Sequence, residues 1–237
     1  MTNYIFFEKD SLKIATGCQD GLLRIYDTCQ PTEPPVELKI VTSAPSDGIM
    51  KVTWSKVEKD IIFVGKKSSV VEKWDTRLSS DAGPVNTIQL NTGHTIMDYE
   101  LNHIHNTIFT ASGNKVHALD LNTLEIVKVY DMPSPLSFKE EGGVTLSPDG
   151  SKFFTGGSDL WLREFDVSSG ELLRTFKGHH GPVRCLRYHP VGQMVASGSE
   201  DGTIRLWDLT YHNNNYTNNN AIVNTNIIVN TPAVLVE

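Results

Sequence analysis

The chain of 237 residues carries a formal net charge of −7, and 39% of its residues are hydrophobic. This length and composition suit one large domain with a buried core, and the acidic balance argues against direct nucleic-acid binding, which needs a basic surface. Its 18 glycines and 11 prolines separate short apolar runs, a pattern that favours many short strands over a few long helices.

The cysteines and the apolar runs indicate the cellular compartment of the protein. Cys18, Cys29 and Cys185 form no CxxC pair, which favours a reducing compartment over a disulfide framework. The apolar run at the N-terminus is too short for a signal peptide, and no apolar stretch approaches the length that spans a bilayer. We therefore expect a cytoplasmic protein with access to the nucleus and no membrane insertion.

A repeated strand pattern runs through the first 210 residues. Each copy has strand-like runs around a tight turn and ends in an aromatic or apolar residue followed by aspartate, at Tyr26-Asp27, Trp74-Asp75, Leu119-Asp120, Phe165-Asp166 and Trp207-Asp208. Successive copies are 48, 45, 46 and 42 residues apart. A further strand is predicted after each of the first four copies, at Val36–Val41, Val85–Leu90, Ile126–Tyr130 and Leu172–Phe176.

These repeats predict an all-β, WD40-type β-propeller of about five four-stranded blades, because one blade buries its faces only against neighbouring blades. The predicted propeller covers residues 1–210, with blades at about 1–41, 44–90, 94–130, 136–176 and 179–210. The chain opens at an inner strand of a blade, so we expect a truncated propeller. Residues 211–237 contain nine asparagines, a composition typical of a disordered tail. An outer strand supplied by Ile227–Val229 and Val234–Val236 is the less favoured alternative.

The last repeat contains the residues of an internal hydrogen-bond network. His179, Ser197, Asp201 and Trp207 stand at the tetrad positions of a WD40 blade, where buried polar groups can satisfy one another. A serine, a histidine and an aspartate also suggest a hydrolase triad. No GxSxG elbow surrounds the serine, and the same spacing recurs in other repeats. We therefore interpret the tetrad as scaffold and expect no enzyme activity.

Other repeats keep only parts of this network. The same spacing predicts partial tetrads at Thr16, Asp20 and Tyr26, at Trp74, and at Thr155, Asp159 and Phe165. The second repeat has Val64 and Ser68 at the serine and aspartate positions, and the third has Gly113 and Leu119 at the turn and tryptophan positions. We expect these two blades to be looser, with His94 as the histidine of the third.

Several other polar groups receive a structural interpretation. The Lys66-Lys67 pair and the Glu140-Glu141 pair are expected to be solvated surface. His103 and His105 have a spacing that metal sites use, but no third ligand accompanies them, so we interpret them as turn or surface histidines. There is no phosphate-binding GxxxxGK[ST] or GxGxxG motif, and we predict no cofactor, metal or small-molecule substrate.

Partners of propellers commonly dock on the loops around the turn aspartates and the GH dipeptide. Register places six residues on these loops, and we predict them as partner-binding: Gln19, Lys67, Ser158, His180, Pro182 and Glu200.

Two segments resemble one WD40 family. Leu12–Asp27 is similar to the third blade, and Lys177–Trp207 to the seventh blade, of the serine-threonine kinase receptor-associated protein (Unrip) family, and the degenerate repeats between them fit the same order. The resemblance implies the last five of seven blades and a scaffold of the survival-of-motor-neuron complex, with Gemin partners, in spliceosomal snRNP assembly, mRNA splicing and mRNA processing. It also implies binding to TGF-β receptors and inhibitory Smad, which dampens TGF-β signalling.

Two alternatives stay open beside this scaffold. One is the i subunit of translation initiation factor three, a sister propeller with a similar last blade. The other is a non-functional truncated isoform that lacks the first two of the seven blades that the resemblance implies.

Overall fold

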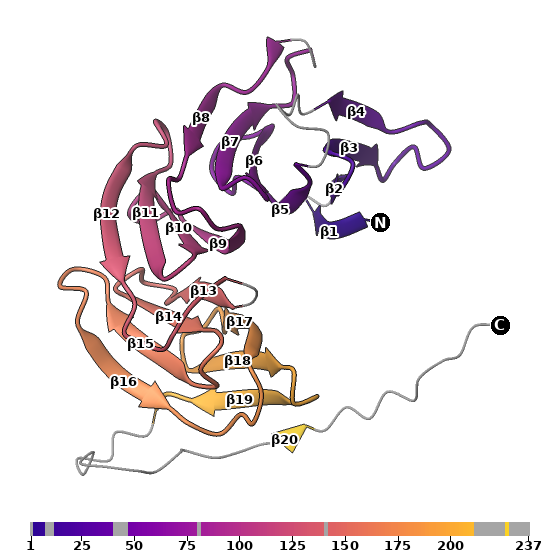
Figure 1. Cartoon of the computed structure of the whole chain (residues 1–237). Helices are drawn as coiled ribbons and strands as arrows, with labels where there is room; N and C mark the ends of the chain where they lie inside the picture. The colour runs from indigo at the N-terminus through magenta and orange to yellow at the C-terminus, as the bar shows by residue number, and fades with distance from the viewer. Residues whose placement is uncertain are drawn as a thin grey trace. The chain divides into compact units, whose positions relative to one another are not determined.

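The computed structural model describes residues 2–7, 12–39, 47–79, 82–139, 142–210 and 226–227. These residues form twenty strands in five antiparallel four-stranded sheets, which confirms the all-β, blade-type prediction. The described part of the chain contains no helix that could cross a membrane. The chain divides into two compact units, Met1–Glu140 and Glu141–Glu237 (Figure 1).

The first unit holds three sheets whose strands follow chain order. The first sheet consists of β1 (Thr2–Phe7), β2 (Lys13–Cys18), β3 (Leu22–Asp27) and β4 (Val36–Lys39). The second consists of β5 (Ile49–Trp54), β6 (Ile61–Lys66), β7 (Val70–Asp75) and β8 (Asn86–Gln89). The third consists of β9 (Ile96–Asn102), β10 (Thr107–Ser112), β11 (Lys115–Asp120) and β12 (Ile126–Asp131).

The second unit holds the other two sheets. The fourth sheet consists of β13 (Gly143–Leu146), β14 (Lys152–Gly156), β15 (Leu162–Asp166) and β16 (Leu172–Phe176). The fifth consists of β17 (Val183–Tyr188), β18 (Met194–Ser199), β19 (Ile204–Asp208) and β20 (Asn226–Ile227).

The last strand of the fifth sheet comes from the asparagine-rich segment. β20 pairs antiparallel with β19, with Ile227 opposite Ile204. The fifth sheet therefore extends beyond the predicted boundary at residue 210. The outer strand, which was the less favoured alternative, is present and is two residues long. The other residues of 211–237 lie outside the described residues. A single propeller over residues 1–210 stays a prediction.

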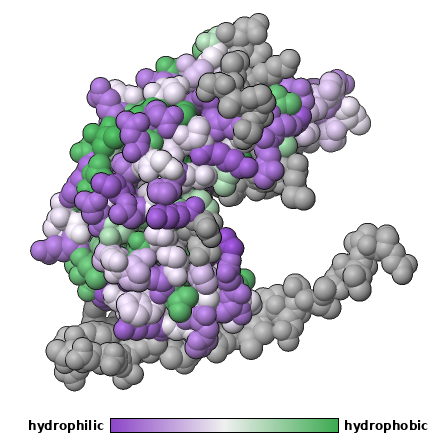
Figure 2. All heavy atoms as spheres, viewed as in Figure 1, coloured by the Kyte–Doolittle hydropathy of each residue, from purple (hydrophilic) through white to green (hydrophobic). Residues whose placement is uncertain are grey.

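A strand's place within its sheet decides its burial. The inner strand β6 is buried at every residue, because other strands cover both of its faces. The outer strands β12 and β16 each bury only one residue. Their exposed apolar residues are Ile126, Val127, Val129, Leu172 and Leu173. Figure 2 shows hydrophobic patches, in green, on the edges of the two units that carry β12 and β16.

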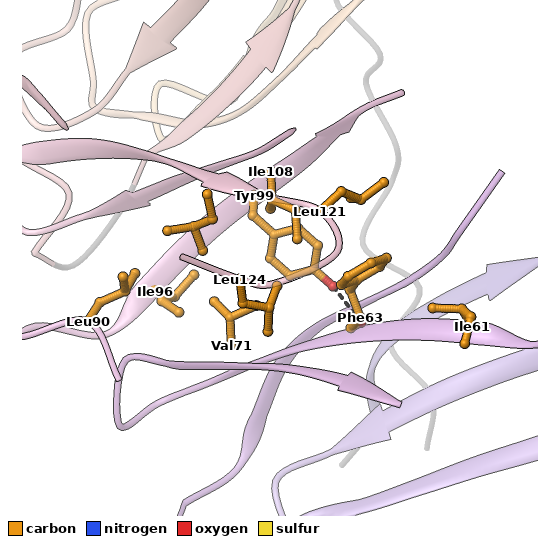
Figure 3. Close-up of a cluster of buried hydrophobic side chains, with 10 residues drawn as sticks. Ile61, Phe63, Val71, Leu90, Ile96, Tyr99, Ile108, Leu121 and Leu124 are labelled. Atoms are coloured by element: carbon orange, nitrogen blue, oxygen red, sulfur yellow. Dashed lines mark hydrogen bonds between the residues drawn. The ribbon is translucent and has the colours of Figure 1, made fainter. Parts of the chain in front are cut away.

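The cores lie between neighbouring sheets within each unit. Apolar side chains of the first and second sheets form one cluster, those of the second and third sheets form another, and those of the fourth and fifth sheets form a third. Figure 3 shows the second cluster, in which the fully buried Tyr99 also donates a 2.7 Å hydrogen bond from its hydroxyl to the Phe63 carbonyl. The buried hydroxyl is thereby satisfied, which keeps the tyrosine compatible with an apolar core.

The aspartate that ends each repeat caps the turn that follows the third strand. The carboxylate of Asp27 accepts the Cys29 amide at 2.8 Å, and that of Asp208 accepts the Thr210 amide at 2.8 Å. The same role falls to Asp75, Asp120 and Asp166. Hydrogen bonds to the charged form favour ionisation. The Arg77 side chain lowers the pKa of Asp75 to about 2, and the Ser168 hydroxyl leads the donors that lower the pKa of Asp166 to about 2. The recurring aspartate is therefore a turn device.

The turn between the second and third strands has one left-handed residue in every sheet. The residues and their φ angles are Gly21 at 78°, Ser69 at 65°, Gly113 at 64°, Leu160 at 70° and Gly202 at 78°. Glycine adopts this conformation without a steric penalty. A residue with a Cβ pays about 1–2 kcal/mol there, so Leu160 is held in a strained position by the turn.

Candidate functional site

The fifth sheet joins the four predicted tetrad residues in one chain of hydrogen bonds. Trp207 on β19 donates its indole N–H to Ser197 Oγ on β18 at 2.8 Å. Ser197 Oγ lies 2.7 Å from Nε2 of His179, which comes from the β16–β17 connection. Nδ1 of His179 lies 3.0 Å from a carboxylate oxygen of Asp201 in the β18–β19 turn. The tetrad therefore links two loops to two strands.

One assignment of protons satisfies the whole chain. The Ser197 hydroxyl donates to Nε2 of a neutral His179, whose Nδ1–H donates to Asp201. Burial lowers the pKa of His179, and this outweighs the opposite effect of Asp201. Burial raises the pKa of Asp201, but hydrogen bonds from Thr203, the His180 amide and His179 outweigh it, so the pKa lies well below its usual range. The network thus holds a neutral imidazole against a carboxylate.

The order Asp201–His179–Ser197 has the connectivity of a hydrolase triad, but its surroundings do not suit one. Ser197 is 1% exposed, and its oxygen already accepts the Trp207 indole N–H. A nucleophile must reach a substrate carbon, and this hydroxyl is covered by the indole and the imidazole. The geometry favours a structural network that fixes the blade.

The second sheet satisfies its tryptophan in another way. Trp74 on β7 donates its indole N–H to Glu72 at 2.8 Å, and the other Glu72 oxygen forms an ion pair with Lys66 on β6. All three side chains are buried. The expectation that Lys66 is solvated surface is therefore wrong, because the lysine faces into the sheet and neutralises a buried glutamate, whereas Lys67 is exposed.

The first sheet does not assemble its predicted partial tetrad. Thr16 is buried on β2, whereas Tyr26 on β3 is 38% exposed. The Asp20 carboxylate turns to Arg24 at 3.3 Å and to the Leu22 amide at 2.9 Å. Its pKa is lowered, because these hydrogen bonds outweigh a raising effect of burial. Asp20 therefore closes its own turn and makes no bridge to Thr16.

The fourth sheet also leaves its predicted partial tetrad unconnected. Thr155 is fully buried, and its hydroxyl has no hydrogen-bond partner in the described residues. Phe165 has no donor to offer and stacks on Phe153 with ring centroids 5.0 Å apart. The Asp159 carboxylate forms a buried ion pair with Arg163, four residues further along the chain.

In the third sheet His94, the predicted histidine of the network, takes part through its backbone carbonyl and not through its ring. The His94 carbonyl accepts the Ser112 hydroxyl at 2.8 Å, and no hydrogen bond to the His94 ring is seen in the described residues. The ring packs against Gly113, where a Cβ would lie 2.8 Å from the ring. Glycine at this turn therefore makes room for the imidazole.

The six predicted partner-binding residues all lie on loops. Gln19 and Lys67 lie on the β2–β3 and β6–β7 turns of the first unit, and Ser158, His180, Pro182 and Glu200 lie on loops of the second unit. All are exposed except Pro182, which is partly buried. Lys67 lines an open hollow of about 410 Å³ whose wall also includes Gln89, Asn91 and His94. The loops thus present accessible polar groups in both units.

The two candidate metal histidines lie in the turn after β9. Among the described residues, no three histidine, cysteine or acidic side chains gather as a metal site would require. Burial and Lys56 lower the pKa of His103, whose ring nitrogens have no hydrogen-bond partner in the described chain. Glu140 and Glu141 lie outside the described residues.

Sequence reasoning missed the buried charges of the first unit. Besides Lys66 and Glu72, Lys51 on β5 forms a buried ion pair with Asp98 on β9, which links the second and third sheets. The available signal was a charged residue within a largely apolar strand, at Lys51 in β5 and at Lys66 in β6.

Four-stranded antiparallel sheets whose third strands end in an aromatic or apolar residue and aspartate, together with one complete His–Ser–Asp–Trp network, have the architecture of WD40 repeats. In agreement, a family model described as WD domain, G-beta repeat matches residues 170–208.

Within this class, the chain is similar to proteins named serine-threonine kinase receptor-associated protein. It is 34% identical over 201 residues to the protein of that name from Dictyostelium discoideum, covering 85% of this chain and 64% of that protein. It is 33% identical over 205 residues to the one from Homo sapiens, covering 85% and 53%. The chain therefore spans between about half and two thirds of these relatives.

A second group of relatives is more distant. Eukaryotic translation initiation factor 3 subunit I from Caenorhabditis briggsae is 28% identical over 165 residues, covering 63% of this chain and 48% of that protein.

Proposed function

We propose that the chain is a non-catalytic scaffold that binds other proteins through its exposed loops. The observation that carries this proposal is the closed tetrad, in which Ser197 is buried and its oxygen is engaged by Trp207. The residues that could have formed a triad stabilise a blade, and the accessible polar groups lie on the turns beside it. Loops on a rigid scaffold are where binding residues concentrate.

The finer proposal concerns the partners. The relatives that match over 85% of the chain carry the name serine-threonine kinase receptor-associated protein. We propose by homology that this chain binds TGF-β receptors and inhibitory Smad, and Gemin components of the survival-of-motor-neuron complex in spliceosomal snRNP assembly and mRNA splicing. The proposed place of action is the cytoplasm, with access to the nucleus.

Partner recovery tests this proposal. A tagged chain would be expressed in cells and its partners quantified by mass spectrometry, with a Trp207→Ala chain as the control for a damaged fifth blade. We expect Gemin components, a TGF-β receptor or inhibitory Smad to be enriched with the intact chain and lost with the variant. Equal recovery of every protein by both chains would contradict a specific scaffold and favour a non-functional isoform.

A second candidate is a subunit of translation initiation factor 3, and the 28% identity to its subunit I favours it. Sedimentation of the chain with 40S initiation complexes, without Gemin or Smad recovery, would support this candidate over the first.

A further inference from the structure

An indole and two cations meet where the fourth and fifth sheets connect. Trp161 ends the β14–β15 turn, and Lys177 begins the β16–β17 connection. Leu162 pairs with Phe176 across the antiparallel strands β15 and β16. Trp161, which precedes Leu162, therefore lies beside Lys177, which follows Phe176. The Lys177 ammonium lies 4.2 Å from the Trp161 ring centroid, and the Arg163 guanidinium lies 5.2 Å from it. The ring therefore holds both cations by cation–π attraction.

Of the two cations, only Arg163 forms an ion pair with a carboxylate in the described residues. Arg163 is buried and forms an ion pair with Asp159. Lys177 is exposed, and no carboxylate in the described part of the chain forms an ion pair with it. The indole contact positions the Lys177 ammonium, which is a positive charge without a counter-charge among the described residues.

A third cation lies beside this lysine. The guanidinium of Arg205 packs against Gly178, where a Cβ would lie 2.8 Å from its Nη1 atom. Its Nε atom is buried and has no hydrogen-bond partner in the described residues. Lys177 and Arg205 thus flank one glycine in a chain of net charge −7.

The turn adds an apolar group to these charges. Leu160 occupies the left-handed position at φ 70°, where the fifth sheet has Gly202 at φ 78°. The leucine is partly exposed and precedes Trp161 directly. A leucine in the left-handed conformation is strained, and such strain at a surface turn is tolerated where the side chain serves a purpose.

We propose that Leu160, Trp161, Lys177 and Arg205, the Lys177 surface, form a docking site for an acidic peptide segment of a partner protein. Carboxylates of the peptide pair with Lys177 and Arg205, and an apolar side chain contacts Leu160. This inference rests on the proposed scaffold function and names the chemistry of one partner. RNA is disfavoured, because the chain's own cations cover the indole that a base would stack on.

Fluorescence anisotropy tests the Lys177 surface directly. The probe is a short fluorescein-labelled peptide of glutamate, leucine and glycine, beside the same peptide with glutamine for glutamate and an oligouridylate of equal charge. We expect only the glutamate peptide to bind, and less tightly at higher salt. Lys177→Glu should weaken binding by about tenfold, because a like charge repels the peptide.

The matched control is Lys128→Glu. Lys128 also lies over an aromatic ring, with its ammonium 4.8 Å from the Tyr130 centroid, but it stands on the outer strand β12. This variant should bind the peptide like the unchanged chain. Thermal unfolding of both variants would exclude a folding defect, and Arg205→Gln provides a second test of the same surface.

The outcomes separate this inference from the scaffold function. No binding of the glutamate peptide, equal loss with Lys128→Glu, or preferential binding of the oligouridylate would overturn the Lys177 surface. If specific partners are still recovered from cells, the inference alone has failed. If the peptide binds through Lys177 but no specific partner is recovered, the scaffold function has failed and the surface stands.

Discussion

The second and fifth sheets each bury a tryptophan on the third strand, but they satisfy its indole N–H with different partners. In the fifth sheet Trp207 donates to Ser197, and a neutral histidine and a turn aspartate complete the network. In the second sheet Trp74 donates to Glu72, whose charge is neutralised by Lys66. The comparison teaches that the position requires a buried acceptor, and that a neutral hydroxyl and a paired carboxylate both provide one.

The largest expected effect is on the charged network. Glu72→Ala leaves the Lys66 ammonium buried without a counter-charge and the Trp74 N–H without an acceptor. Breaking a buried pair on one side costs about 3–5 kcal/mol. Urea unfolding followed by tryptophan fluorescence should show this loss in the free energy of unfolding of the first unit.

The double variant Lys66→Met with Glu72→Gln is the matched control. It removes both charges and keeps an acceptor for Trp74, so most of the stability should return. If Glu72→Ala and the double variant unfold alike, charge pairing is not what stabilises the second sheet.

The neutral network should lose less when its central member is removed. Ser197→Ala leaves the Trp207 N–H and His179 Nε2 without their shared partner, and we expect a loss of about 1–3 kcal/mol in the unfolding free energy of the second unit. Chemical denaturation measures it. An unchanged stability would show that the tetrad does not stabilise its blade.

Thr155 occupies the position in the fourth sheet that Ser197 occupies in the fifth, but we expect its removal to have the opposite effect on stability. Its hydroxyl is buried and lacks a partner in the described residues. Thr155→Val keeps the shape and removes an unsatisfied polar atom, so stability should stay the same or rise by up to about 1 kcal/mol. A loss comparable with that of Ser197→Ala, measured in the same denaturation series, would mean that the hydroxyl is satisfied after all.

The smallest expected effect is the dependence on pH. Because the pKa of His179 is lowered in the fold, its contribution is fully present above the unfolded value of 6.5 and is lost as the pH falls through the folded pKa. The stability of the second unit should therefore decline below about pH 6.5. The Asp201 pKa is also lowered, so its contribution is lost only in stronger acid. In His179→Gln the unfolding free energy of the second unit should fall less steeply below about pH 6.5. If the pH dependence is unchanged in this variant, groups other than His179 cause the decline.

The same two sheets show what the sequence could reveal. The Ser197 network was predictable because its four members stand at fixed spacings within a repeated unit. The Lys66–Glu72 network was not, because two adjacent lysines on a polar-looking turn resemble solvated surface. Lys66 is buried because β6 is covered on both faces. This burial results from the packing of strands against one another, which the local sequence does not reveal.

The other errors have similar causes. Spacing placed Asp20 and Asp159 at tetrad positions, but each found a nearer arginine four residues along the chain. The fifth sheet's outer strand lies beyond an asparagine-rich stretch whose composition gives little strand signal. For the two aspartates, local spacing defined the candidate, and competition between partners in the folded chain decided the outcome.

The central claim is that the Ser–His–Asp network is scaffold, and a serine-directed fluorophosphonate probe tests it most directly. The folded chain would be treated with the probe and digested, and the Ser197 peptide examined by mass spectrometry. We predict no adduct on Ser197, because its oxygen is buried and accepts the Trp207 indole N–H. An adduct on Ser197 that disappears in His179→Gln would show an activated nucleophile and contradict the account.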